Sequence, residues 1–172
     1  MKNTPAPNGL LTQSRLHELF SYDPGTGEFT RKVQTTPSTQ IGQVAGCRMK
    51  LGYVSIGVDA KRYLAHRLAW LFVYGKWPDK HIDHIDGNTS NNRLNNLRDV
   101  SVVVNAQNRT RCNKQRRSGS GLLGAHRHFD GSWRARIRVN GKTVHIGLYK
   151  TPQEAHEAYL AYKRIHHAGC TL

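Results

Sequence analysis

Hydrophobic positions along this chain recur at two spacings, which predict where helices and strands lie. Helical spacing occurs in residues 12–20, where Leu16, Leu19 and Phe20 share one face, and an apolar run fills residues 66–74. Alternating or short apolar runs bounded by turn residues predict strands. In the first part of the chain these strands are expected at 28–31, 43–47, 52–58, 62–65, 81–84 and 96–100.

The residues that flank the two expected helices support their positions. Thr12 stands where its hydroxyl group can cap the first helix. Gly75 follows the apolar run, so the buried helix is expected to end there. His66, at the start of this helix, is either a ligand or a hydrogen-bonded structural histidine. The structural role is the more common one for a histidine beside core residues.

The C-terminal third has the pattern of three strands followed by a helix. The strands are expected at 123–128, 132–139 and 142–148. Asp-Gly at 130–131 and Asn-Gly at 140–141 lie between them, and both dipeptides favour tight hairpin turns. A capping box at 151–154 starts a helix that runs to about residue 167. This order predicts a small three-stranded antiparallel sheet packed on one helix, and the chain as a whole belongs to the α+β class.

The segment between the two patterned regions has no hydrophobic periodicity. Residues 110–121 are rich in Arg, Lys, Ser and Gly, as is typical of a linker. Arg116 and Arg117 suit this linker to a polyanion. The chain is therefore expected to divide into N-terminal scaffold strands, a polar core region, a basic linker and a C-terminal unit, at 1–60, 61–109, 110–121 and 122–172.

The net charge of the chain is +15, from 26 Lys and Arg against 11 Asp and Glu. A protein this basic usually binds a polyanion; nucleic acid is the first candidate and an anionic membrane surface the second. The charge is concentrated near the C-terminus, because residues 111–172 carry 12 basic and 3 acidic side chains. Residues 61–110 keep 4 acidic side chains, as a cation-binding site would require.

Cysteine usage and hydropathy restrict the class of protein further. Cys47, Cys112 and Cys170 are far apart and form no C-x-x-C pair, which argues against a disulfide framework and a structural zinc site. This usage fits the reducing cytoplasm, where we expect the protein. No apolar run approaches the length of a membrane span, and no obligate protein partner is evident.

Residues 81–105 hold an excess of His, Asp and Asn, which form turns, bind metal ions and transfer protons. Asp83 offers a carboxylate oxygen and Asn105, on a short helix expected after Ser101, an amide oxygen. Oxygen ligands favour Mg²⁺ or Mn²⁺ over zinc. An ordinary imidazole has a pKa of about 6.5, so His84 is suited to accept a proton from water. The few carboxylates argue for one metal ion rather than two.

The spacing of four residues in this stretch resembles the HNH nuclease motif in its H-N-N form. Asn96 follows the Asp83-His84 pair by twelve residues, and Asn105 follows nine residues later. The flanking sequence HRLAW and the turn DGN are also typical of HNH homing endonucleases from phages and introns. The likeness covers about residues 62–109.

This resemblance implies a ββα-metal fold and a DNA endonuclease that leaves 5′-phosphate and 3′-hydroxyl ends. It implies His84 as general base, with Asp83 and Asn105 as ligands of one divalent cation. It implies Asn96 as a brace that holds the loop and His84 in place, double-stranded DNA as partner, and a phage or other mobile element as source. Because successive strand residues face opposite ways, Asp83 and His84 serve one site only if the strand bends or ends there. One site per chain makes nicking the simpler outcome for a monomer.

Alternation along the middle C-terminal strand places basic side chains on one face and apolar side chains on the other. The basic face carries Arg134, Arg136 and Arg138, and the next strand adds Thr143 and His145. A β-ribbon of this kind can enter the major groove of DNA, where Arg contacts guanine and phosphates. The alternative is a solvated basic face.

The C-terminal unit resembles the DNA-binding domain of plant APETALA2 and ethylene-response factors. The matching motifs are Gly124, 131–138, 146–149 and 151–159. Arg138 and Tyr159 fall on positions that contact DNA in that family, which implies the same role here.

These observations together predict an HNH-type homing endonuclease directed by a C-terminal DNA-binding domain. The main alternative is a non-catalytic DNA-binding regulator whose HNH region has decayed, against which the intact set of four residues argues. A ribosome- or RNA-associated basic protein is a third candidate. It explains the charge but not the set of four.

Overall fold

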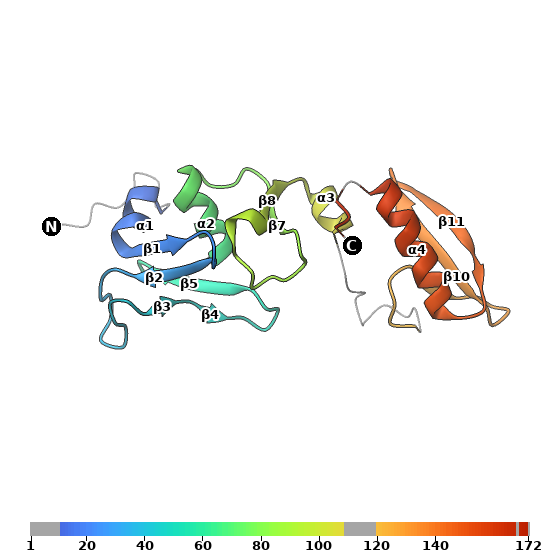
Figure 1. Ribbon diagram of the computed structural model, residues 1–172, viewed down its shortest axis with the longest axis horizontal. Coiled ribbons are helices and arrows are strands. Elements are labelled where there is room, and N and C mark those ends of the chain that lie inside the picture. The colour runs from blue at the N-terminus through green and yellow to red at the C-terminus, as the bar shows by residue number, and fades with distance from the viewer. Residues whose placement is uncertain (1–10, 109–119, 168, 172) are drawn as a thin grey trace. The chain divides into compact units, whose positions relative to one another are not determined.

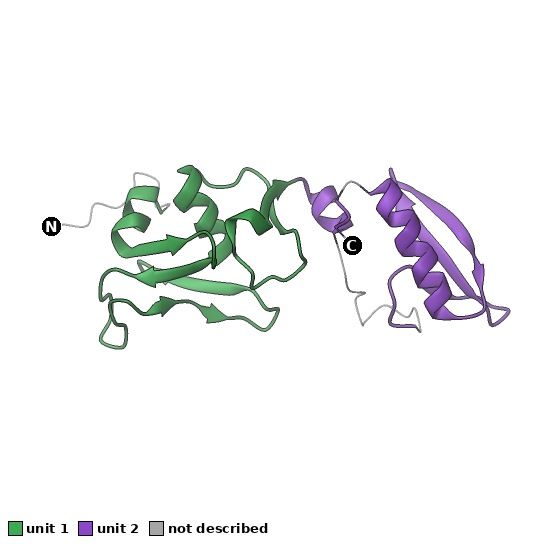
Figure 2. Cartoon of the chain, in the orientation of Figure 1, with its two compact units in different colours: residues 1–100 green, residues 101–172 purple. Residues whose placement is uncertain are grey.

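The computed structural model describes residues 11–108, 120–167 and 169–171. Contacts divide the chain into two compact units, residues 1–100 and 101–172 (Figure 2). This division falls inside the segment 61–109, which the sequence predicts as one region, and the predicted domain boundaries stay predictions. Each unit is described by itself.

Within its described residues, the first unit contains helices α1 (Gln13–Leu19) and α2 (Ala65–Tyr74) and three small antiparallel sheets (Figure 1). A 3-10 turn, η1 (Leu94–Asn96), precedes the last strand. The strands are ordered β1-β2-β3, β4-β5-β6 and β7-β8. Their bounds are β1 (Phe20–Asp23), β2 (Glu28–Arg31), β3 (Val44–Ala45), β4 (Cys47–Arg48), β5 (Val54–Val58), β6 (Lys61–Leu64), β7 (His81–His84) and β8 (Leu97–Val100).

One hydrophobic core joins the helices and sheets of the first unit. Leu16 and Leu19 are buried on α1, as their helical spacing predicts. Phe20 is also buried, but the helix expected over 12–20 ends at Leu19, and Phe20 begins strand β1 in an extended conformation. Ile82 from β7 and Leu97 from β8 belong to the same core. The β7–β8 hairpin is therefore fixed to the scaffold by buried apolar contacts, which are non-directional but scale with the area removed from water.

Local signals set most element ends in this unit. Thr12 caps α1, since its hydroxyl oxygen accepts a hydrogen bond from the Arg15 backbone N–H at 3.2 Å. Gly75 ends α2 in the left-handed conformation, with φ of 72°. The single strand expected over 43–47 is wrong: Gly46, with φ of 131°, separates β3 from β4, which belong to different sheets.

The second unit, over its described residues, comprises α3 (Val102–Gln107), a three-stranded antiparallel sheet and α4 (Pro152–His166). The strands, ordered β11-β10-β9, are β9 (Ala125–Arg127), β10 (Trp133–Val139) and β11 (Lys142–Tyr149). Helix α4 packs against all three strands, which confirms the predicted sheet-on-helix arrangement. The centre of this small core is made of Ala125, Ala135 and Ala155, all fully buried, because small side chains allow the helix and sheet to approach closely.

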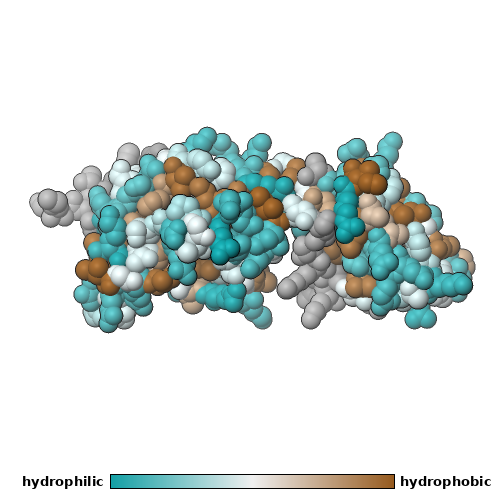
Figure 3. All heavy atoms as spheres, in the orientation of Figure 1, coloured by the Kyte–Doolittle hydropathy of each residue, from teal (hydrophilic) through white to brown (hydrophobic). Residues whose placement is uncertain are grey.

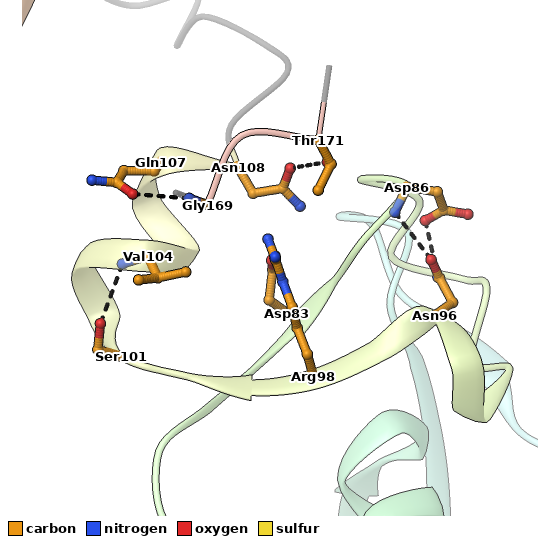
Figure 4. A network of polar contacts seen from close by, with 10 residues as sticks. All are labelled: Asp83, Asp86, Asn96, Arg98, Ser101, Val104, Gln107, Asn108, Gly169 and Thr171. Carbon is orange, nitrogen blue, oxygen red and sulfur yellow. Dashed lines mark hydrogen bonds and ion pairs between the residues drawn. The ribbon is translucent and has the colours of Figure 1, made fainter. Parts of the chain in front are cut away.

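Turn and cap chemistry positions the elements of the second unit. Asn140 and Gly141 both have positive φ, 49° and 79°, as a two-residue hairpin turn requires. Thr151 and Glu154 form the predicted capping box at the start of α4. Ser101 caps α3 through a hydrogen bond from the Val104 backbone N–H at 3.3 Å (Figure 4).

The surface is mixed in character. On the face drawn in Figure 3, hydrophobic side chains are interspersed with hydrophilic ones. The most exposed large hydrophobic residues are Phe129, Leu51 and Ile165, which come from separate segments. No helix among the described residues is long and apolar enough to span a lipid bilayer.

Gly27, in the turn between β1 and β2, packs directly on the loop that leads to η1. Its φ is 79°, and a Cβ atom would lie 2.4 Å from the carbonyl carbon of Asn92 and 2.5 Å from the backbone nitrogen of Arg93. We expect Gly27→Ala to lower the free energy of unfolding by about 3 kcal/mol, because left-handed strain and overpacking add. Urea unfolding followed by tryptophan fluorescence measures this loss.

Gly42→Ala is the matched control for this substitution. Gly42 also has positive φ, 81°, but nothing lies within 4 Å of the added Cβ. We therefore expect Gly42→Ala to lower the free energy of unfolding by only about 1 kcal/mol, because only the strain of the left-handed conformation applies. Equal losses in the two variants would show that the contact with Asn92 and Arg93 does not stabilise the first unit.

Candidate functional site

The candidate site lies on the β7–β8 hairpin of the first unit. The antiparallel register pairs Asp83 with Arg98 and His84 with Leu97. Strand alternation therefore places His84 on the side of the core residue Leu97, and Asp83 on the other side with Arg98. Asp83 and His84 can serve a single site if the strand bends or ends there. Strand β7 does end at His84.

His84 is enclosed, with 4% of its surface exposed. Its ring lies edge-on to the ring of His66, with centroids 5.0 Å apart, and 6.0 Å from the ring of Tyr53. Its Nε2 is 3.2 Å from Oδ1 of Asn92. Burial lowers the pKa of His84, and the Asn92 hydrogen bond and the charge of Asp86 oppose this only in part. His84 is therefore neutral at neutral pH, the form that accepts a proton.

His66 is a buried neighbour of this imidazole, with 5% of its surface exposed. Burial, then the charges of His84 and Arg67, lower its pKa to about 3. Its Nδ1 has no hydrogen-bond partner within the described part of the chain. The burial agrees with the structural role considered from the sequence, although the expected hydrogen bond is not found at this nitrogen.

Asn96 ties together the loop between β7 and β8 (Figure 4). Its Oδ1 accepts a hydrogen bond from the Asp86 backbone N–H at 3.0 Å, and its Nδ2 donates to the Asp86 carboxylate at 3.0 Å. The same Nδ2 donates to the backbone oxygen of Asn91 at 2.8 Å. These are the contacts that a brace would make, and the role of Asn96 in a reaction stays a prediction.

The carboxylate of Asp86 is used inside this loop. It accepts hydrogen bonds from the Asn88 backbone N–H at 2.8 Å and from the Asn91 amide at 2.7 Å, besides that from Asn96. Burial raises the pKa of Asp86, but these hydrogen bonds outweigh it, and the net pKa is lowered. An ionised Asp86 thus stabilises the turn.

Asp83 has 5% of its surface exposed and pairs with a cation (Figure 4). Both Nε and one terminal nitrogen of Arg98 donate to Asp83 Oδ2, at 2.9 and 2.7 Å. A carboxylate is a suitable oxygen ligand for Mg²⁺ or Mn²⁺. Within residues 11–108, 120–167 and 169–171, no three His, Cys, Asp or Glu side chains are grouped to hold a metal ion. The predicted metal site does not need such a group, because its two protein ligands are the carboxylate of Asp83 and the amide oxygen of Asn105.

Asn105 lies on α3 and belongs to the second unit. Because each unit is described by itself, its position relative to Asp83 stays a prediction. Two further predicted residues, Arg116 and Arg117 of the basic linker, lie outside the described residues.

The predicted basic face is present on the sheet of the second unit. Arg136 and Arg138 are exposed, whereas Ala135, which precedes Arg136, and Ile137, which lies between the two arginines, are buried, as strand alternation predicts. The register places Arg136 beside His145 and Arg138 beside Thr143 on β11. A hollow of about 260 Å³ opens on this face; it is lined by His128, Arg134, Arg136, Thr143, His145 and Leu148.

Two other candidates of this unit make contacts within the fold. Nε of Arg138 donates to the backbone oxygen of Gly141 at 3.1 Å. Tyr159 on α4 is half-buried, and its ring lies so close to Gly124 that a Cβ there would come within 2.1 Å of it. Their contacts with DNA stay predictions.

The structure adds two residues that the sequence did not single out. Arg98 forms an ion pair with Asp83. Aligning the two predicted strands of the hairpin residue by residue would have placed Arg98 opposite Asp83. Asn92 contacts His84, but it stands among several similar asparagines, and no sequence signal distinguishes it.

The family model described as HNH endonuclease matches residues 63–107. This segment contains Asp83, His84, Asn96 and Asn105, and it is similar to HNH endonucleases. The match thus confirms the HNH part of the sequence interpretation. The ββα-metal arrangement and the resemblance of residues 122–169 to the APETALA2 domain stay predictions.

Comparisons with whole proteins add little to this match. No curated protein matches the chain. A solved structure described as "DNA binding and cleavage by the HNH homing endonuclease I-HmuI" is 22% identical and covers 88% of each chain, with a TM-score of 0.44. A likeness at this level carries no argument about the fold or function of this chain.

The buried histidines His66 and His84 predict how the stability of the first unit depends on pH. Their folded-state pKa values lie below the unfolded value, so the unfolded chain binds protons that the folded chain does not. Stability is therefore complete above pH of about 6.5 and declines as the pH falls. The decline is at most about 1.4 kcal/mol per pH unit for each histidine until its folded-state pKa is reached.

We expect His66→Phe to weaken this pH dependence, measured by urea unfolding between about pH 7 and pH 4. The substitution keeps a ring in the core but removes one group that gains a proton on unfolding. His81→Phe, at the exposed start of β7, is the control and should leave the slope as in the wild type. A wild-type slope in the His66 variant would contradict the burial argument.

Proposed function

We propose that this protein is a DNA endonuclease of the homing type that hydrolyses phosphodiester bonds with His84 as general base. The observation that carries the proposal is the HNH endonuclease match over residues 63–107. The environment of His84 supports it, because burial keeps this imidazole neutral at the end of β7.

In the proposed reaction, the oxygen of a water molecule attacks the phosphorus while His84 accepts a proton from that water. The bond between phosphorus and the 3′ oxygen breaks, and the leaving oxygen takes up a proton from solvent water. His84 then releases the proton that it accepted to solvent. The products are a 5′-phosphate and a 3′-hydroxyl end. Asn96 acts as a positioning residue, since it holds the loop that follows His84 through the hydrogen bonds to Asp86 and Asn91.

One divalent cation, Mg²⁺ or Mn²⁺, would stabilise the charge that develops on the phosphate and the leaving oxygen. Asp83 and Asn105 would hold it, and their carboxylate and amide oxygens fit a hard cation. Arg98 supports this role, because its two hydrogen bonds to Oδ2 hold the buried carboxylate of Asp83 in a fixed orientation.

The basic sheet face of the second unit is the proposed binding surface for double-stranded DNA. Arg136 and Arg138 are exposed on it. Nε of Arg134 is buried and has no hydrogen-bond partner within the described residues. Phosphate oxygens are strong acceptors for such guanidinium groups. Thr143, His145, Tyr159, Arg116 and Arg117 complete the proposed contact set, in the manner of an APETALA2-like domain.

A non-catalytic DNA-binding regulator with a decayed HNH region is the second candidate function. It would keep the basic face and lose the chemistry. Either protein would act in the cytoplasm of a bacterial host if a phage or other mobile element encodes it, and a monomeric nuclease with one site would nick.

A cleavage assay on supercoiled DNA with Mg²⁺ or Mn²⁺ tests the catalytic proposal. We expect the wild type to relax the plasmid, and His84→Ala to be slower by about 100-fold or more, as loss of a general base predicts. A chelator should stop the reaction, and added Mg²⁺ or Mn²⁺ should restore it. The control is His81→Ala, which removes an exposed histidine from the same strand. A wild type that never cuts, or a His84 variant that cuts as well, would favour the regulator.

The DNA-binding surface is tested separately by the salt dependence of affinity. We expect Arg136→Ala to weaken binding and to reduce the slope of log K against log salt by about 0.9, since each phosphate contact releases about that many counterions. Lys150→Ala removes the same charge from an exposed position at the end of the sheet, and should change the slope less. Equal effects would point to the net charge alone and not to the sheet face.

A further inference from the structure

The loop residue Asn92 is almost completely buried, with 4% of its surface exposed, although its neighbours in this polar loop are the half-buried Asn91 and the exposed Arg93. An asparagine that only forms a turn does not need such burial. Its side-chain Oδ1 is 3.2 Å from Nε2 of His84. A buried polar contact of this kind constrains both partners, because leaving either group unsatisfied costs free energy.

The orientation of the Asn92 amide follows from its second hydrogen bond. Nδ2 donates to the backbone oxygen of Ser90 at 3.4 Å, so Oδ1 is the atom that faces His84. An amide oxygen accepts and cannot donate. The proton of the neutral imidazole must therefore lie on Nε2, which leaves the lone pair on Nδ1.

The backbone of Asn92 is held from the N-terminal hairpin. The hydroxyl group of Tyr22, on β1, donates to the Asn92 backbone oxygen at 2.7 Å in a buried position. The backbone N–H of Leu94 donates to the backbone oxygen of Pro24 at 3.1 Å. Gly27 fills the remaining space against Asn92. The β1–β2 hairpin thus fixes the segment from which the amide reaches His84.

We propose that Asn92 is a positioning residue that selects the Nε2–H tautomer of His84 and orients Nδ1 as the atom that takes the proton from water. This inference rests on the proposed role of His84 as general base. It also gives the β1–β2 hairpin a function, since Tyr22 and the turn that contains Gly27 hold the asparagine in place.

The tautomer is measured directly, without DNA or metal, from the ¹⁵N chemical shifts of the His84 ring in histidine-labelled protein at about pH 8. We expect Nε2–H in the wild type and in Asn92→Asp, which keeps an acceptor oxygen. Asn92→Ala should show a mixture of tautomers. Asn95→Ala removes an exposed asparagine of the same loop and should leave the ring shifts unchanged. Dominant Nδ1–H in the wild type, or unchanged shifts in Asn92→Ala, would overturn the proposal.

Cleavage kinetics supply the second readout. We expect Asn92→Ala to lower kcat by about 10- to 100-fold, the range found for residues that orient a catalytic or ligating histidine, with unchanged DNA affinity. Asn92→Asp should recover part of this loss, and Tyr22→Phe, which removes only the hydroxyl group, should cause a smaller one. If Asn92→Ala does not fold, the comparison of wild type with Asn92→Asp and Tyr22→Phe still decides. A wild type with the expected tautomer that does not cleave DNA would refute the proposed function and leave intact only the assignment that Asn92 selects the tautomer of His84.

Discussion

The hydrogen bonds of the Asn96 side chain hold together the loop on which the rest of the site depends. The loop between β7 and β8 is long and polar, and its backbone groups cannot all pair within the hairpin. Asn96 satisfies three of its polar groups at once, two on Asp86 and one on Asn91. An amide can do this because it presents a donor and an acceptor on one planar group. Replacing it with an apolar residue would leave several polar groups of the loop without partners.

The same hairpin places two residues that are adjacent in the sequence, Asp83 and His84, in different environments. His84 faces the core, where burial keeps it neutral. Asp83 faces the other side of the hairpin, where Arg98 stabilises its charge. A strand normally separates consecutive side chains in this way, and here the separation gives a proton acceptor and a carboxylate in distinct environments. Asp83 and His84 are therefore neighbours in the sequence with different surroundings in the fold, which the amino-acid types alone do not reveal.

The sequence predicts those parts of the molecule that local signals determine. Thr12, the Asn140-Gly141 turn and the Thr151 capping box each act within a few residues, and each is found where the sequence places it. The break at Gly46 was missed because its positive φ depends on how two sheets meet, which is not local information. The Asn92–His84 contact was missed for the same reason. Eight residues separate the two side chains, and the fold of the loop decides which of several asparagines turns inward.

The proposed general base and most of the net charge belong to different parts of this chain, whereas the proposed metal ligand Asn105 lies on α3 in the second unit. The first unit provides His84 and Asp83, and the residues that fix them, Asn96 and Arg98, belong to the same hairpin. Most of the net positive charge lies after residue 110, including the arginine row on β10. Phosphate contacts provide affinity and register but little chemistry, whereas a general base needs a dry, fixed environment. A buried hairpin suits the second requirement, and an exposed sheet face suits the first. A single surface cannot be both buried, as the general base requires, and exposed, as phosphate contacts require. This is a physical reason for the proposed general base and the arginine row to belong to separate units.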